Sequence, residues 1–304
     1  MPLKRAEQLE LEDAKYARSW AEHSHSLETG KIYGAAAQML SPVSGIHVDL
    51  GSGLGQLLFE LKYQNPQATV IGVDNNRHLV KGSAMILERS GIPAVEGGKI
   101  IDREAVDGVV VQQYRRNRRV RPREVLRRGQ ASIIADDIRQ MRVIKEILGD
   151  KKIDSGSLTF PGSSVRSAVE KVADFHALSD QEVFTRQQQI MQRVRAAAGQ
   201  FFTERVRRGG KVLIAERVGI DEGASLEEVI AYNLRQIFTD NHTKWDFDGV
   251  RQFSAGGSYS PTVGANQMIT HSMHQDSGIE LSTTASTAPT NPTMYIVMST
   301  WKKR

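Results

Sequence analysis

The chain of 304 residues contains no cysteine. This absence excludes disulfides, thiolate metal sites and a cysteine nucleophile, and it agrees with the cytoplasmic location that we expect. Long hydrophobic runs are also missing. No segment is apolar enough to cross a membrane, and the first twenty residues lack the apolar core of a signal peptide, so we expect no membrane partner. A large charge excess is missing too, since the net charge is only +5. Such mild basicity permits a nucleic-acid partner without requiring one.

A nucleotide-binding pattern lies between Ile46 and Asp74. One apolar run ends in the sequence DLGSGLG at residues 49–55, an amphipathic segment follows, and a second apolar run over 68–73 ends in Asp74. A strand, a glycine turn, a helix and a second strand that ends in a carboxylate form the first half of a nucleotide-binding α/β sheet. The glycines permit a tight turn and let a ligand approach the backbone. Asp74 is placed to accept both hydroxyls of a ribose.

The glycine spacing indicates which nucleotide this is. A dinucleotide fingerprint has a third glycine where this chain has Gln56, which counts against a nicotinamide oxidoreductase. The chain reads D-x-G-x-G-x-G instead, and here it resembles the class I S-adenosylmethionine-dependent methyltransferases. The resemblance implies S-adenosyl-L-methionine as cofactor, with S-adenosyl-L-homocysteine as its product. It also implies a set of cofactor-binding residues: Asp49, Gly51, Ser52, Gly53 and Gly55 around the loop, Asp74 and Asn75 at the ribose, and Asp136 at the adenine, with Asp137 as the next match.

The same resemblance implies an α/β fold with a seven-stranded, mostly parallel, doubly wound sheet. We divide the chain into an N-terminal helical cover, 1–44, and a SAM-binding domain, 45–304. Trp20 to Tyr33 can form a lid over the cofactor or a helix packed against the sheet, and both alternatives stay open. Periodicity and turn signals predict later strands at 131–135, 153–160, 211–216, 267–272 and 294–301, and helices at 77–90, 139–148, 167–178, 181–207 and 226–238.

An arginine-rich segment interrupts this order. The stretch of about 92–130 reads as an insertion, and eight arginines lie between Arg115 and Arg128, opposed there only by Glu124. Arginine pairs with phosphate or carboxylate through two parallel hydrogen bonds, and a dense run is an electrostatic footprint for nucleic acid. A solvated helix that pairs with carboxylates elsewhere, a homodimer contact and an anionic small substrate are the alternatives. The residues predicted to contact substrate or nucleic acid are Arg115, Arg116, Arg118 and Arg119.

We therefore expect a methyltransferase that acts on a small-molecule acceptor. The first alternative is a methyltransferase of bases in structured RNA, either tRNA or rRNA, and the second is a non-catalytic binding module of the same fold. Methyl transfer from a sulfonium depends mainly on alignment, and a general base is needed only for a protonated nucleophile. Glu216, at the end of the strand 211–216, is our candidate catalytic residue. We expect no metal, because His23 and His25 have no accompanying ligands.

Overall fold

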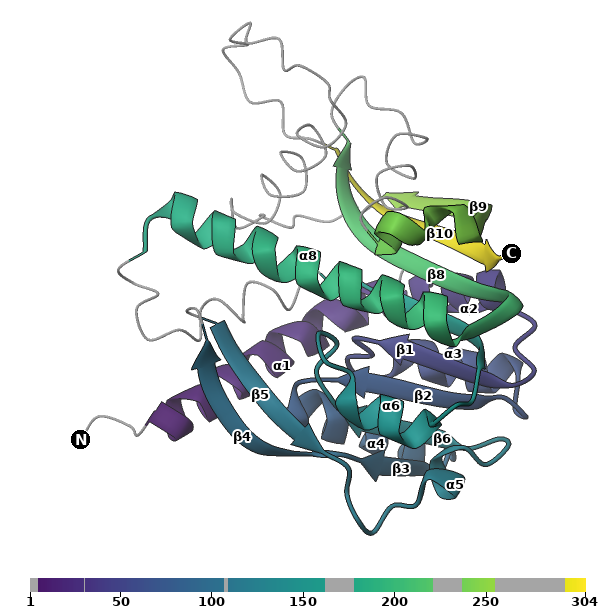
Figure 1. The fold of residues 1–304 in the computed structure, drawn as a ribbon, viewed down its shortest axis with the longest axis horizontal. Coiled ribbons are helices and arrows are strands. Elements are labelled where there is room, and N and C mark those ends of the chain that lie inside the picture. The colour runs from purple at the N-terminus through teal and green to yellow at the C-terminus, as the bar shows by residue number, and fades with distance from the viewer. Residues whose placement is uncertain (1–4, 30, 107–108, 162–177, 221–236, 255–292) are drawn as a thin grey trace, which may run out of the picture.

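The structure is a computed structural model that describes residues 5–29, 31–106, 109–161, 178–220, 237–254 and 293–304 (Figure 1). Its centre is an eight-stranded sheet in the order β3-β6-β2-β1-β7-β8-β10-β9. The strands from β3 to β8 in this order are parallel, and β10 runs antiparallel to both of its neighbours. Their bounds are β1 Ile46–Leu50, β2 Thr69–Asp74, β3 Ala94–Gly97, β6 Ala131–Ala135, β7 Ile153–Thr159, β8 Val206–Ile220, β9 Trp245–Ser254 and β10 Thr293–Lys303.

Helices cover both faces of this sheet, as a doubly wound fold requires. One face carries α2 (Ile32–Leu40), α3 (Gln56–Gln64) and α4 (Arg77–Arg89), and the other carries α6 (Arg142–Leu148) and α8 (Asp180–Arg205) (Figure 1). The first helix, α1 (Arg5–Thr29), lies across α2 and α4. The predicted fold class is thus confirmed. The division into domains at residue 44 stays a prediction.

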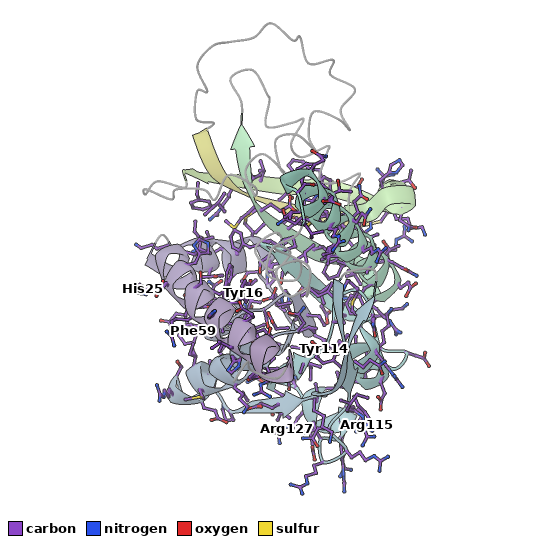
Figure 2. All side chains as sticks on the ribbon, turned by 90° about the vertical axis from the view of Figure 1, so that its left-hand side faces the viewer. Tyr16, His25, Phe59, Tyr114, Arg115 and Arg127 are labelled. Carbon is purple, nitrogen blue, oxygen red and sulfur yellow. The ribbon has the colours of Figure 1, made fainter. Side chains whose placement is uncertain are left out.

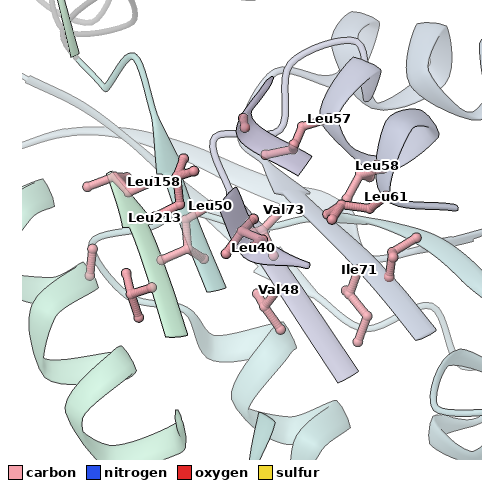
Figure 3. Packing of buried hydrophobic residues seen from close by; sticks show 14 of the residues in the cluster. Leu40, Val48, Leu50, Leu57, Leu58, Leu61, Ile71, Val73, Leu158 and Leu213 are labelled. Carbon is pink, nitrogen blue, oxygen red and sulfur yellow. The ribbon is translucent and has the colours of Figure 1, made fainter. Parts of the chain in front are cut away.

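The core lies between these layers because apolar residues recur on the inner side of each element. Leu57, Leu58 and Leu61 are spaced so that they share one face of α3, and all three are almost fully buried. On β2 they face Gly72, where a Cβ would stand 2.7 Å from the Leu58 side chain, and they belong to one buried cluster with Ile71 and Val73 (Figure 3). The central strands are buried on both faces, which is why they read as continuous apolar runs. The sheet therefore holds the ends of β1 and β2 rigidly.

The sequence prediction was wrong in the number of strands. Two of the eight strands of the sheet were not predicted, the antiparallel strand β9 and Ala94–Gly97, which forms the parallel edge strand β3 beside β6. The predicted insertion thus begins with a strand of the main sheet. It continues as a two-stranded hairpin, β4 (Lys99–Val106) and β5 (Val109–Arg115), and ends in the short helix α5 (Pro122–Val125).

The antiparallel end of the sheet also differs in detail from the prediction. The last strand, β10, pairs with β8 on one side and with β9 on the other. No strand was predicted where β9 lies, after the short helix η2 (Thr239–Lys244). The predicted strand at 267–272 lies outside the described residues. The predicted helices at 167–178 and 226–238 lie almost wholly outside them.

Candidate functional site

The glycine loop, Gly51–Gly55, lies between β1 and α3 at the carboxyl edge of the sheet. Gly51, Gly53 and Gly55 have φ values of 77°, 55° and 77°, a backbone conformation that residues other than glycine rarely adopt. The N–H groups of Gly51 and Ser52 donate to the carbonyl of Val73, at 2.8 and 3.1 Å. The loop therefore folds back over the end of β2 with bare backbone on its surface.

Asp74 is the last residue of β2, and the glycine loop is tied to its carboxylate. The N–H of Gly53 donates to Asp74 Oδ2 at 2.9 Å, and the N–H of Asn76 donates to Oδ1 at 2.8 Å. Asn76 in turn caps α4 by accepting from the N–H groups of His78 and Leu79. Loop, carboxylate and helix start are thus fixed together.

Asp49 lies beneath the loop in a buried hydrogen-bond chain that crosses two strands. The hydroxyl of Ser157 donates to Asp49 Oδ1 at 2.6 Å, while His47 lies 3.0 Å from Ser157 Oγ and 2.9 Å from Ser155 Oγ. Burial lowers the pKa of His47 to about 3, so the imidazole is neutral. Because Ser157 gives its proton to Asp49, His47 Nε2 carries the hydrogen that Ser157 accepts.

The pKa of Asp49 is itself raised, to about 7. Burial is the main cause, the charge of Asp74 adds to it, and the hydrogen bond from Ser157 opposes it. Sequence reasoning placed Asp49 at the loop but missed the chain that holds it. The only signal was Ser155 and Ser157, two polar residues in register with β1 inside a buried strand.

Asp136 and Asp137 follow β6 and take different roles. Asp136 accepts from the N–H groups of Asp137 and Ile144, both at 2.9 Å, so it holds the first turn of α6. Its pKa is raised to about 6, chiefly by burial. Asp137 accepts from Arg139 Nε at 2.9 Å and lines the cleft described next. Asp137, rather than Asp136, is the residue of this pair that faces the cleft.

A cleft at the carboxyl edge of β1, β2 and β7 brings the glycine loop together with Asp74 and Asp137. Its enclosed volume is about 50 Å³. Helix α1 covers it with two aromatic side chains, and α8 supplies an apolar wall. The residues that line it include Tyr16, Trp20, Gly51, Gly53, Asp74, Asn75, Asp137, Phe160, Ile190 and Val194. Trp20, Phe160 and the two residues from α8 were not among the predicted site residues.

Glu216 lies elsewhere, in a buried ion pair. Its Oε1 accepts from Nη2 of Arg195 at 2.7 Å, and both side chains are at least 93% buried. Glu216 belongs to β8 and Arg195 to α8, so the pair ties this helix to the sheet. The described lining of the cleft does not include Glu216. Its catalytic role stays a prediction.

The arginine segment forms an exposed patch near the cleft. Arg116 pairs with Glu146 at 2.7 Å, and Glu124 accepts from the backbone N–H of Arg121. Six other arginines are exposed, and in the described part of the chain their side chains have no hydrogen bond or ion pair: Arg115, Arg118, Arg119, Arg121, Arg123 and Arg128. In Figure 2, Arg115 and Arg127 both lie at the lower end of the molecule. We call the six arginines without a described partner, from Arg115 to Arg128, the arginine patch; Arg127, which bonds Gln130, is not part of it.

Tyr114 links the patch to the cleft. Its hydroxyl donates to the carbonyl of Asn75 at 2.7 Å, and its ring is 2% exposed. Burial and the nearby charges, first that of Asp137, raise its pKa well above the usual value, so the hydroxyl keeps its proton. The arginine patch thus begins one residue after Tyr114, which is hydrogen-bonded to Asn75 in the lining of the cleft.

Comparisons with known proteins find likeness of fold alone. No protein-family model and no curated protein matches the chain. Solved structures match over most of its length. Geranyl diphosphate methyltransferase in complex with SAM is 11% identical, with 92% of this chain and 87% of that chain covered and a TM-score of 0.45. TrmN from Thermus thermophilus is 9% identical, covering 90% and 48%, with a TM-score of 0.45.

A third match, the [4+2]-cyclase SpnF, is 10% identical, covering 90% of this chain and 80% of that chain, with a TM-score of 0.44. One of these three similar structures is a cyclase. A shared fold therefore does not determine which reaction a protein catalyses. At TM-scores below 0.5 these matches identify no family. In the part of the chain that the structure describes, no helix is long and apolar enough to span a membrane.

Proposed function

We propose that this protein is a methyltransferase that binds S-adenosyl-L-methionine in the cleft and transfers its methyl group to a small-molecule acceptor. The observation that carries the proposal is the hydrogen bond between Gly53 and Asp74. The glycine loop, which presents bare backbone at Gly53, is hydrogen-bonded to the carboxylate that ends the next strand. In a parallel α/β sheet, ligands bind at this edge, beyond the carboxyl ends of the strands.

The residues of the cleft fit the chemistry of this cofactor. Asp74 offers a carboxylate for the two ribose hydroxyls, and Asn75 lines the cleft beside it. Asp137 offers an acceptor for an amino group at the far end of the cleft. Gly51 and Gly53 give bare backbone against which the amino-acid part can lie, and Ile190 and Val194 are apolar. A pyrophosphate-binding loop would have a third glycine at Gln56, and this one does not.

The chain contributes position rather than acid–base chemistry. The cofactor, when bound, supplies a methyl group on a sulfonium, which is an excellent leaving group. Asp74 and Asp137 fix the two ends of the nucleoside, and the buried Ser157–Asp49 bond keeps the loop from shifting. Phe160, directly after β7, lines the cleft and is placed to exclude water from the reacting end. Alignment of this kind supplies much of the barrier reduction in a displacement reaction.

A small acceptor is supported by the shape and lining of the cleft. The cleft lies beneath α1, and aromatic and apolar side chains line it together with Asp74 and Asp137. Pockets for small molecules are typically enclosed and apolar with a few placed polar groups.

A titration tests the cofactor directly. We expect S-adenosyl-L-methionine and S-adenosyl-L-homocysteine to bind with measurable heat in calorimetry, while ATP and NAD, which carry phosphates, give none. Binding without transfer to any acceptor would favour the non-catalytic alternative. If neither sulfur compound binds, the proposed function is wrong.

RNA is the second candidate acceptor, and the arginine patch favours it. Six exposed arginines that have no partner among the described residues are suited to phosphate groups, and Tyr114 places the start of the patch beside the cleft. Because Tyr114 is buried, the patch has no aromatic ring for base stacking. It suits the backbone of a folded RNA better than a single strand.

Salt dependence separates the two acceptors. We expect R118Q/R119Q/R121Q to reduce the salt slope of RNA binding by about two to three units if each arginine meets one phosphate. The matched control is K81Q/R89Q/K151Q, which removes the same charge from exposed positions elsewhere. Equal slopes in the wild type and both variants would leave the small molecule as the acceptor.

A further inference from the structure

Trp20 lies directly on the glycine loop. A Cβ atom built on Gly53 would stand 2.3 Å from Trp20 Nε1, so the indole covers the face of Gly53 that turns to the cleft. Trp20 is 93% buried. Its N–H has no hydrogen-bond partner among the described residues, although a buried indole N–H usually has one.

The cleft beneath Trp20 is too small for a nucleoside. Its volume of about 50 Å³ compares with roughly 300 Å³ or more for pockets that hold a ligand of cofactor size. The rest of its lining comes from the carboxyl edge of the sheet, from the loops that follow the strands there, and from α4 and α8, which pack on the sheet. Trp20 and Tyr16 are the two lining residues that come from α1, a helix outside the sheet layers. Movement of α1 is therefore the simplest way to enlarge the cleft.

Polar contacts hold α1 down, and they converge on one turn. Glu10 lies 2.7 Å from His78 Nε2 and also pairs with Arg77. Asn76 donates from its side chain to the carbonyl of Asp13 at 2.9 Å. These partners follow directly after Asp74, so the helix is fastened to the same turn that carries the ribose-binding carboxylate.

We propose that Trp20 is a gate on the methyl donor's binding site, with α1 as its hinged support and the Glu10 contacts as its latch. The indole occupies the face of Gly53 against which the donor's amino-acid part must lie, so binding of the donor displaces it. This inference rests on the proposed function, because it takes the cleft as the donor site. It goes further in assigning a closed form and the residues that maintain it.

The gate lowers the apparent affinity for the donor, because only the fraction of molecules in the open form can bind it. When the open form makes up about one-tenth of the molecules, the apparent dissociation constant is about tenfold above the intrinsic one. Removing the indole eliminates this factor. A residue that instead contacts the bound donor would have the opposite effect, because its removal would weaken binding.

Calorimetry with S-adenosyl-L-homocysteine on three proteins tests the gate. We expect W20A to bind about tenfold more tightly than the wild type, and W20F, which keeps a ring over Gly53, to gain less. Tighter binding by W20A supports the gate. Equal or weaker binding by W20A, with binding retained by the wild type, overturns the gate and leaves the proposed function standing. Absence of binding in all three proteins overturns both.

The latch provides a second arm that leaves Trp20 in place. We expect E10Q to tighten binding of S-adenosyl-L-homocysteine several-fold and to speed hydrogen exchange in α1. E12Q is the matched control, because Glu12 lies on the same helix and pairs only with Lys15 among the described contacts. If E10Q and E12Q behave alike in both measurements, the latch is wrong.

Tryptophan emission reports the gate in the unmodified protein. The chain has three tryptophans, and Trp245 and Trp301 are 3% and 2% exposed beside Phe238, away from the cleft. We expect S-adenosyl-L-homocysteine to shift the emission of the wild type to longer wavelength, as Trp20 leaves its buried position, and to leave W20F unchanged. Bound ligand without a shift in the wild type contradicts the gate.

Discussion

The backbone N–H of Gly53 and the side chain of Asp74 are joined by a hydrogen bond of 2.9 Å. One oxygen of the carboxylate thereby holds the glycine loop, and the other holds the start of α4 through Asn76. A carboxylate has about four acceptor positions, so Asp74 can keep both bonds and still accept from a ribose. The structural role of Asp74 and its proposed binding role therefore use the same carboxylate.

The first prediction concerns this carboxylate. D74N leaves one acceptor oxygen for two backbone donors, so one N–H would face the new amide group. We expect a loss of about 1–3 kcal/mol in the free energy of unfolding and a loss of S-adenosyl-L-homocysteine binding. D150N, at an exposed position, is the control and should change neither. Normal binding by D74N would show that the carboxylate does not hold the ligand.

A second prediction separates backbone strain from contact with Trp20. G53A and G91A both place a Cβ on a glycine with positive φ, 55° and 76°. Strain of this kind costs about 1 kcal/mol. At Gly91 nothing lies within 4 Å of the new atom, whereas at Gly53 it meets the indole of Trp20. We expect denaturant unfolding to show a larger loss for G53A, accompanied by a change in tryptophan emission. Equal losses would contradict the close contact.

The pKa of Asp49 leads to a third prediction, on pH. An unfolded carboxyl titrates near 3.8, and burial raises the pKa of Asp49 to about 7. Between these values the folded protein keeps a proton that the unfolded chain has released. The contribution of Asp49 to stability therefore falls as the pH rises from about 4 to about 7.

Comparison with D49N isolates this contribution, because Asp136 and His47 titrate in both proteins. We expect the unfolding free energy of the wild type, relative to D49N, to fall by on the order of 1–4 kcal/mol across that window. Denaturant titrations at several pH values measure it. A difference that stays constant, or rises with pH, would show that Asp49 ionises at its ordinary pKa.

The fourth prediction tests the two roles open to Glu216. Removing one partner of a buried ion pair leaves an uncompensated charge and costs about 3–5 kcal/mol. We expect E216Q to lose stability on this scale, and R195M/E216L, which removes both charges, to recover most of it. Thermal unfolding of the three proteins provides the comparison. A stable E216Q without methyl transfer would instead make Glu216 the catalytic residue that the sequence suggested.

The site was predictable where it depends on local sequence. An apolar strand that ends in Asp74 and a loop of three glycines before Leu57 identify their own positions, because a carboxylate is costly inside a buried strand unless a partner satisfies it. Edge strand β3 was missed for a related reason. Ala94–Gly97 is short, contains the exposed Glu96 and has no apolar run.

Contacts that depend on the angle between elements were not predictable. The His47–Ser157–Asp49 chain requires β7 to lie beside β1, which the order of strands along the sequence does not state. The covering of Gly53 by Trp20 requires the direction in which α1 crosses the sheet. Periodicity of α1 predicted a helix but left open whether it is a lid or a packed layer.

A crystal structure of the protein grown with S-adenosyl-L-homocysteine tests the central claim most directly. The account predicts that the ribose hydroxyls lie within hydrogen-bond distance of Asp74, that the amino-acid part lies against Gly53, and that Trp20 has left that face. A ligand bound elsewhere, with the indole still on Gly53 and Asp74 unengaged, would contradict it.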